Sequence, residues 1–358
     1  MNEEILEKVV EETKRLIEIP SYKDCTQILR YLENRLDFIN FKKQYVDKSI
    51  DSNPQYNLVN LSKPFMINTH VDTVPPINME NPFKPVIKDN KIYGRGAADT
   101  KGLIASLIVA LEIFKEKYPD RDIPVSISFT VDEENHTALG SQKLIKMLDG
   151  IEYILVLEPT YGIICNQQIG TLEFEIETTV DSVHASEFEK ADNPVKKLMH
   201  YVDKIETILE RPVNIIKLNS GWDYYAVPEK ANMLAEVKVF ENEDIKTLED
   251  KIKSILDKKS KFKNIDSEEF LKFNCDKEVD IVSQAYEKAL NKEPIVGAMP
   301  SWTDAANYHK AGIKTTVFGF GSLKDAHTKR EYISFSDLEN MTKVLYNLFS
   351  ILTQFQRS

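Results

Sequence analysis

Ionisable residues stand directly after apolar or glycine-rich segments at five separate places in this chain. They are His70 with Asp72, Asp99, Glu133 with Glu134, Glu158, and His327. In α/β proteins with a parallel sheet, ligands gather at the carboxyl ends of the strands, so segments far apart in sequence can meet there. Each residue alone also has an ordinary explanation, as a loop residue or as a carboxylate at a helix start. Five such positions in one chain favour a shared site.

The chemistry of this set favours a metal centre. Clustered carboxylates repel one another unless cations lie among them, and a mixed set of His and Asp/Glu suits Zn²⁺. In hydrolytic sites, two metal ions that share a bridging carboxylate lie about 3.5–4 Å apart. The sequence therefore predicts a metal site.

The elements expected to position these residues alternate between strand and helix. Apolar strand segments are predicted at 65–68, 125–131, 153–157 and 315–319, and helical periodicity at 3–19, 26–36, 102–117, 138–148, 280–290 and 335–352. Such alternation is typical of a mostly parallel sheet flanked by helices. The predicted fold class is therefore α/β.

The pattern changes after about residue 166. Residues 172–180 alternate apolar and polar, and they are followed by a helical segment at 194–209, strands near 213–218 and 233–240, a Lys-rich helix near 245–259 and a strand near 270–274. This order matches a small α+β βαββαβ domain of the ferredoxin-like kind. We predict an inserted domain at 166–277 and a discontinuous catalytic domain formed by 1–165 and 278–358. The Lys258–Lys263 cluster is expected to be a solvated face.

Composition excludes some partners. The 358 residues carry a formal net charge of −11, which argues against nucleic acid and anionic membrane as partners because both need a basic field. We find neither a secretory signal pattern at the N-terminus nor an apolar run of about 18–20 residues. Three widely spaced cysteines, Cys25, Cys165 and Cys275, fit reduced core thiols. These observations predict a cytoplasmic protein.

The motifs, taken in order, resemble those of the M20 family of metallopeptidases and amino-acid N-deacylases. The matching segments are His70-Val-Asp72-Thr-Val-Pro, the glycine-rich turn 93–102, Asp132-Glu133-Glu134, Glu158-Pro159-Thr160 and Ala326-His327-Thr328. They cover almost the whole chain. Within the family they look most like those of acetylornithine and acetyl-lysine deacetylases.

This resemblance implies roles for single residues. Asp99 would bridge two divalent metal ions, most simply Zn with Co or Mn as substitutes, with His70 and Glu158 completing one site and Glu134 and His327 the other. Asp72 would orient the His70 imidazole. Glu133 would be the general base that takes a proton from the metal-activated water and passes it to the leaving amine.

Residues of the inserted domain and of a C-terminal loop are implied less directly. His184 stands where members of the family carry a histidine that crosses a dimer interface and polarises the scissile carbonyl. The preceding residues Asp181-Ser-Val depart from the family pattern. A structural or surface histidine is therefore the alternative. Lys238 stands where many members have an arginine, and it lacks the bidentate fork. Asn232 and Trp302 are further candidates for substrate contact, and a core role for Trp302 is equally open.

The resemblance implies a small substrate and a homodimer formed through the inserted domain. The leading hypothesis is hydrolysis of an N-acyl amino acid of the N-acetylornithine or N-acetyl-lysine type. The alternatives are a metallo-exopeptidase acting as dipeptidase or carboxypeptidase, a succinyl-diaminopimelate desuccinylase, and a hydrolase that releases lysine or ornithine from an amino-group carrier protein. The absence of an arginine in Ser301-Trp302-Thr303-Asp304-Ala305-Ala306 weighs against the desuccinylase. A non-catalytic binding protein would have lost ligands or Glu133, and all of them are present.

Overall fold

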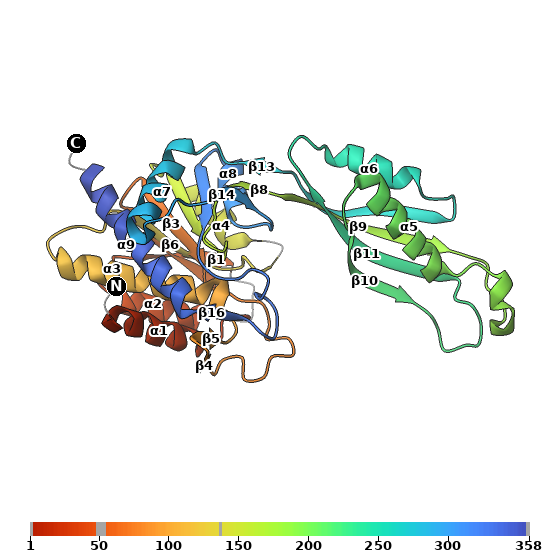
Figure 1. Cartoon of the computed structure of the whole chain (residues 1–358), viewed down its shortest axis with the longest axis horizontal. Coiled ribbons are helices and arrows are strands. Elements are labelled where there is room, and N and C mark those ends of the chain that lie inside the picture. Colours follow the sequence, from red (N-terminus) through yellow and green to blue (C-terminus); the bar gives the residue numbers. More distant parts are fainter. Residues whose placement is uncertain (1–2, 48–54, 136–137, 356–358) are drawn as a thin grey trace. The chain divides into compact units, whose positions relative to one another are not determined.

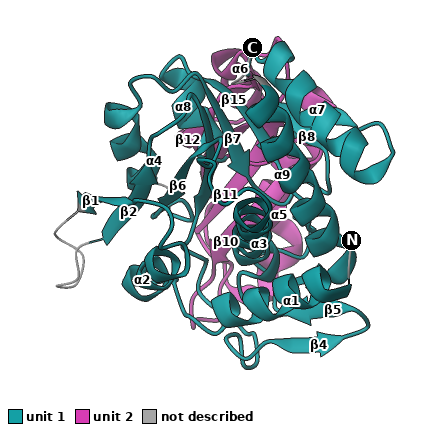
Figure 2. Cartoon of the chain, turned by 90° about the vertical axis from the view of Figure 1, so that its left-hand side faces the viewer, with its two compact units in different colours: residues 1–167, 273–299, 303–358 teal, residues 168–272, 300–302 magenta. Residues whose placement is uncertain are grey.

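The computed structural model describes residues 3–47, 55–135 and 138–355 and divides into two compact units. Unit 1 comprises residues 1–167, 273–299 and 303–358, and unit 2 comprises residues 168–272 and 300–302 (Figure 2). The boundaries predicted at 166 and 277 lie close to these, while the functional roles given to the two parts stay predictions. Among the residues described, no helix has both the length and the apolar character needed to span a bilayer.

Unit 1 is built on a mixed sheet whose central strands are parallel. Its strands, in spatial order, are β1 (Lys42–Asp47), β2 (Gln55–Asn60), β6 (Ser126–Thr130), β3 (Phe65–His70), β7 (Tyr153–Leu157), β15 (Lys314–Phe318) and β8 (Ile164–Gln168), with β14 (Val296–Met299) paired to β8. Strand β3 is parallel to β6 and β7, and β7 is parallel to β15. The prediction of an α/β fold with a helix-flanked sheet is confirmed, with antiparallel strands added on both sides of the parallel core.

Helices cover this sheet. Figure 2 shows one group packed together on one side and a smaller pair on the other. The first group contains α1 (Glu3–Ile17), α3 (Gly102–Lys117), α7 (Asp276–Leu290) and α9 (Phe335–Phe355). The pair consists of α4 (Leu139–Leu144) and α8 (Ala305–Lys310). A further helix, α2 (Thr26–Arg35), contacts β2. Helix α3 is buried over most of its surface, as its continuous apolar sequence requires.

The register of the parallel strands brings their carboxyl ends to one rim. His70, the last residue of β3, pairs with Thr130, the last of β6, and Phe318 at the end of β15 pairs with Leu157 at the end of β7. A close approach fixes the rim beside β15, because a Cβ on Gly319 would lie 2.4 Å from the carbonyl oxygen of Glu158. Only glycine leaves room for that contact.

Unit 2 is an α/β sandwich with a four-stranded antiparallel sheet. The chain order is β9 (Gly170–Thr179), α5 (Pro194–Leu209), β10 (Asn214–Ser220), β11 (Lys230–Val239), α6 (Ile245–Ser254) and β12 (Ser260–Glu268), and the spatial order is β10-β11-β9-β12. Figure 1 shows α5 and α6 on the same face of this sheet. Alternate residues of β9 and β11 pack against the two helices in a core that includes Phe174, Met233 and Ile205. This is the predicted βαββαβ order.

The last strand of unit 2 lies earlier in the sequence than predicted. Residues 260–268 form β12, whereas the expected strand at 270–274 is reduced to β13 (Leu271–Lys272), which lies outside the unit 2 sheet. The lysines hid the strand pattern, because Lys261 and Lys263 are exposed while Phe262 between them packs against the core and stacks on Phe174. Lys261 and Lys263 therefore lie on one face of an edge strand, and Lys258 and Lys259 directly precede it.

Candidate metal centre

Five of the predicted ligands come together at the rim of the unit 1 sheet. His70 ends β3, Asp99 lies in the turn η1 (Ala97–Lys101) before α3, Glu134 follows β6, Glu158 follows β7, and His327 lies in the loop after β15. His70, Asp99 and Glu158 are 2%, 6% and 4% exposed, whereas half of the His327 side chain is exposed. The ligand atoms of His70, Asp99 and Glu134 lie within 4.8 Å of one another, which is close enough to hold one metal ion.

Asp99 stands between two imidazoles. Its Oδ1 lies 3.0 Å from Nε2 of His70, and its Oδ2 lies 3.2 Å from Nε2 of His327. Nε2 of His327 also lies 2.9 Å from Oε2 of Glu134, and Nε2 of His70 lies 3.6 Å from Oε1 of Glu158. Each carboxylate oxygen of Asp99 thus faces a different half of the cluster, which is the arrangement that a bridging ligand needs.

The contacts of Asp72 differ in detail from the expectation. Nδ1 of His70 donates to the backbone carbonyl of Asp72 at 3.0 Å, and the carboxylate Oδ1 is farther away, at 3.6 Å. Oδ2 instead accepts a hydrogen bond of 3.0 Å from the backbone N–H of Glu134. With Nδ1 acting as the donor, deprotonation of Nε2 would leave its lone pair free to bind a metal ion. Asp72 therefore links two segments that carry ligands, and its carbonyl orients the ring.

Burial and close charges shift the pKa values of the cluster. Burial disfavours a charged His327, but Asp99 and Glu134 outweigh it and raise its pKa to about 10. Burial likewise disfavours a charged His70. Glu158 and the other carboxylates near His70 outweigh this effect and raise the pKa of His70 well above its ordinary value. Burial raises the pKa of Glu158 to about 7 and that of Glu133 well above its usual value. Imidazolium protons thus stand where a metal would bind, so metal and protons compete for the cluster.

Glu133 lies beside the cluster without joining the ligand set. Its carboxyl interacts electrostatically with His70, Glu158 and Glu134, and its side chain makes no hydrogen bond to any described residue. A carboxyl that is close to the ligands, partly accessible and unpaired is free to exchange protons with a bound reactant.

One buried carboxylate near the cluster was assigned no role from the sequence. Asp304 accepts hydrogen bonds from Thr130 Oγ1 at 3.1 Å and from Ser141 Oγ, and burial raises its pKa to about 6. It also interacts electrostatically with Glu133. In the sequence, Asp304 is recognisable only as an Asp that follows Thr303. That pattern is equally typical of a residue at a helix start, so it does not identify a buried carboxylate near the cluster.

The remaining predicted site residues lie in unit 2. His184 is exposed at the start of η3 (Ala185–Lys190), where its Nδ1 contacts Ser186 Oγ at 2.9 Å. Asn232 and Lys238 are half-buried on β11 and contact Glu175 and Thr171 respectively. Trp302 is half-buried and falls in unit 2 with residues 300–301. Their functional roles stay predictions.

The positions of Asn232 and Lys238 limit what both can do. They are six residues apart on one extended strand, a separation of about 20 Å at roughly 3.4 Å per residue. One N-acyl amino acid does not span that distance. Their backbone positions alone therefore do not bring both residues to one substrate molecule within one subunit.

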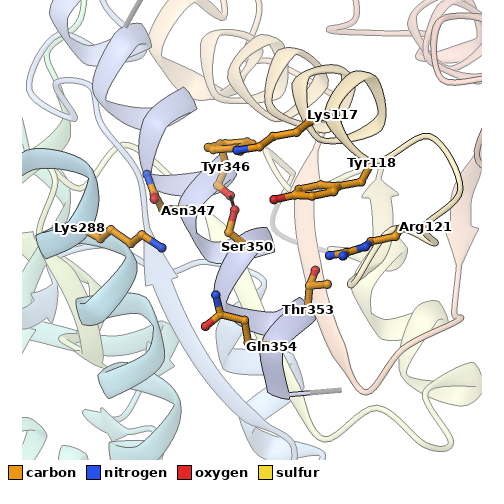
Figure 3. A pocket seen from close by; sticks show the side chains of 9 residues that line it. All are labelled: Lys117, Tyr118, Arg121, Lys288, Tyr346, Asn347, Ser350, Thr353 and Gln354. Carbon is orange, nitrogen blue, oxygen red and sulfur yellow. Dashed lines mark hydrogen bonds between the residues drawn. The ribbon is translucent and has the colours of Figure 1, made fainter. Parts of the chain in front are cut away.

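A separate cavity of about 440 Å³ contains none of these residues. Lys117, Arg121 and Lys288 line it together with Tyr118 and Tyr346, which come from α3, the loop after it, α7 and α9 (Figure 3). Lys117 and Lys288 lie in the last turns of α3 and α7, where a cation offsets the partial negative charge of the helix end. That electrostatic role accounts for the two lysines, while Arg121 lies in the loop after α3 with its guanidinium 4.4 Å from the centre of the Tyr118 ring.

Comparison with known proteins assigns the family. Residues 66–350 match peptidase family M20/M25/M40. The chain belongs to this family. It is accordingly an enzyme of the metallopeptidase and amidohydrolase type. A succinyl-diaminopimelate desuccinylase from Pelagibacter ubique (strain HTCC1062) is 27% identical, over 92% of this chain and 95% of that protein.

Solved structures share the M20 fold. A tripeptidase from Staphylococcus aureus subsp. aureus mu50 has a TM-score of 0.77 at 20% identity, with 98% of this chain and 99% of that chain covered. Human carnosine dipeptidase 1 has a TM-score of 0.76 at 15% identity, covering 98% and 96%. A Bacillus subtilis protein described as a dinuclear metal binding peptidase of family M20 has a TM-score of 0.65 at 14% identity, covering 99% of each chain. At these identities the likeness concerns the fold.

Proposed function

We propose that this M20 enzyme cleaves the amide bond of an N-acyl amino acid of the N-acetylornithine or N-acetyl-lysine type and uses two divalent metal ions. The observation that carries the proposal is the position of Asp99, whose two carboxylate oxygens face two different imidazoles at 3.0 and 3.2 Å. His70 and Glu158 would complete one metal site. Glu134 and His327 would complete the other.

The donor set fits such ions. Oε1 of Glu158 and Oδ1 of Asp72 are buried and have no hydrogen-bond partner among the described residues. A buried anionic oxygen without a partner is unfavourable, and a cation in the cluster would compensate the Glu158 oxygen. The mixture of imidazole and carboxylate favours Zn²⁺, with Co²⁺ or Mn²⁺ as substitutes.

The metal ions, Glu133 and His184 would have different roles in the reaction. When bound, the metal ions would polarise the scissile carbonyl and lower the pKa of a coordinated water to roughly 7. A carboxylate oxygen of Glu133 would accept the proton lost by the attacking water and deliver it to the leaving amine nitrogen. The raised pKa of Glu133 supports this role, because burial favours the carboxyl in its protonated form between the two transfers. His184 would polarise the scissile carbonyl.

The adjacent residues Glu133 and Glu134 allow the roles of base and ligand to be separated. Glu133→Gln should keep wild-type metal content and lose about 10²- to 10⁴-fold in kcat, because only proton transfer is removed. Glu134→Gln should lose metal, because a ligand oxygen is replaced by an amide. Metal analysis and steady-state kinetics on both variants check this. Full activity in Glu133→Gln would contradict the assignment of the base.

The substrate assignment has one competitor with specific support. The relative from Pelagibacter ubique is named a succinyl-diaminopimelate desuccinylase, which favours a succinylated substrate. Against it, residues 301–306 contain no arginine that could pair with a succinyl carboxylate. The motifs around His70 and Glu158 favour the acetyl group. Dipeptidase activity, carboxypeptidase activity and the release of lysine or ornithine from a carrier protein are further alternatives.

A substrate panel discriminates between these activities. We expect the Zn²⁺- or Co²⁺-loaded enzyme to hydrolyse N-acetylornithine or N-acetyl-lysine with a higher kcat/KM than N-succinyl-diaminopimelate or simple dipeptides. Turnover of dipeptides alone would contradict the deacylase proposal, and preference for the succinyl compound would favour its competitor.

We also propose that unit 2 forms a homodimer through the edge strand β10. Every residue of β10 is exposed, and β10 pairs only with β11 in the described sheet. Ile215, Ile216 and Leu218 are 38%, 47% and 40% exposed. An apolar edge strand is prone to pair with another strand, and a second copy of the same strand completes a two-fold interface.

Charges on this edge should prevent dimerisation. We expect light scattering to give a dimer for the wild type and a monomer for Ile216→Lys/Leu218→Lys, because lysines on an edge strand disfavour pairing. Ile265→Lys, on the opposite edge strand β12, is the matched control and should stay dimeric. A monomeric wild type, or a β10 variant that remains dimeric, would refute this interface.

A further inference from the structure

Arg95 and Glu331 form a buried ion pair beside the metal cluster. Their side chains are 0% and 1% exposed, and Nη1 of Arg95 donates to Oε2 of Glu331 at 2.6 Å. The two residues are 236 positions apart in the chain. The pair therefore joins the glycine-rich turn before α3 to the segment that follows His327.

The second oxygen of Glu331 holds the backbone of Asp99. Oε1 accepts hydrogen bonds from the N–H groups of Ala98 at 3.1 Å and Asp99 at 3.2 Å. Asp99 is the residue whose two oxygens face both imidazoles. A shift of its backbone would move both oxygens together, so the contact with Glu331 bears on both halves of the cluster.

The backbone of Glu331 ties the loop of His327 to the same turn. Glu331 lies four residues after His327, and its carbonyl accepts from the N–H of Gly94 at 3.3 Å. The next residue, Tyr332, starts β16 (Tyr332–Ser334) and pairs with Tyr93 at the end of β5 (Lys91–Tyr93). Half of the His327 side chain is exposed, so packing holds it only in part and the anchoring of its loop matters.

The stability of the fold does not explain this ion pair. Nε and Nη2 of Arg95 are buried without a hydrogen-bond partner among the described residues. Desolvation of a buried pair offsets much of its attraction, and well-packed apolar residues often replace such a pair without loss of stability. What apolar residues cannot supply is an oxygen that accepts from the N–H of Ala98 and Asp99.

We propose that Glu331, held by Arg95, is a positioning residue that fixes Asp99 and the His327 loop in the geometry required to bind two metal ions. This inference rests on the proposed dinuclear function. Glu331 lies four positions beyond the last predicted ligand, and Arg95 in the glycine-rich turn would hold its carboxylate in place.

The test is a titration of metal-free protein with Zn²⁺ and with Co²⁺, followed by calorimetry and by the visible spectrum of Co²⁺. Glu331→Gln should weaken at least one of the two binding steps by about 10- to 100-fold, the range found when outer partners of metal ligands are removed. The Co²⁺ spectrum should change, and excess metal should restore kcat at an unchanged KM. Both binding steps within twofold of wild type would overturn the proposal.

A control ion pair exists in unit 2. Arg211 and Glu243 are more exposed than Arg95 and Glu331, at 12% and 25%, and Glu243 also accepts a backbone N–H, that of Phe240 at 2.7 Å. Glu243→Gln removes the same charge from an Arg–Glu pair that lies outside unit 1 and should leave both metal-binding steps unchanged. An equal loss of metal affinity in Glu243→Gln would overturn the proposal, because it would make the effect a general loss of stability.

A second variant covers the case in which Glu331→Gln does not fold. Arg95→Met/Glu331→Met removes both charges and should fold, as judged by circular dichroism, while binding metal more weakly than wild type. Wild-type affinity in this double variant, or failure of both variants to fold, would make the pair a structural element and overturn the positioning role. If the wild-type protein does not bind two metal ions, the proposed dinuclear function is wrong. That result would be distinct from a failure of the Glu331 variants to change metal binding.

Discussion

The central physical constraint in unit 1 is the burial of several ionisable side chains at one rim of a sheet. Asp99, Glu158 and His70 are almost fully buried, and Glu134 and His327 complete the group. Such a group is stable only when charges of opposite sign alternate at close range. In the metal-free protein the two imidazoles supply the positive charge, as the raised pKa values of His70 and His327 indicate. Divalent cations would supply it in the proposed working state.

The surrounding structure can be understood as support for this cluster. The register of β3, β6, β7 and β15 brings four strand ends together, and Gly319 allows the close approach beside Glu158. Asp72 links the backbone of Glu134 to the carbonyl that orients His70. These contacts hold the backbone of Glu134 and Glu158 and the ring of His70, which are three of the predicted ligands. The support is therefore distributed over segments that the sequence separates widely.

The sequence predicted that these residues come together because strand ends are easy to recognise. His70 and Glu158 follow short apolar runs, and the parallel order of the sheet then requires them to be neighbours. The sequence did not predict Glu331, because a carboxylate in a polar loop has no local feature that distinguishes it from a solvated one. Its burial depends on a contact with Arg95 from the other end of the chain. Similarly, β12 was missed because exposed lysines alternate with Phe262.

The dinuclear proposal depends above all on Asp99 bridging two metal ions. The most direct measurement is anomalous diffraction at the Zn or Co absorption edge from crystals of the metal-loaded protein. We expect two peaks about 3.5–4 Å apart, one near His70 and Glu158 and the other near Glu134 and His327, with Asp99 between them. A single peak, or peaks remote from Asp99, would contradict the dinuclear proposal.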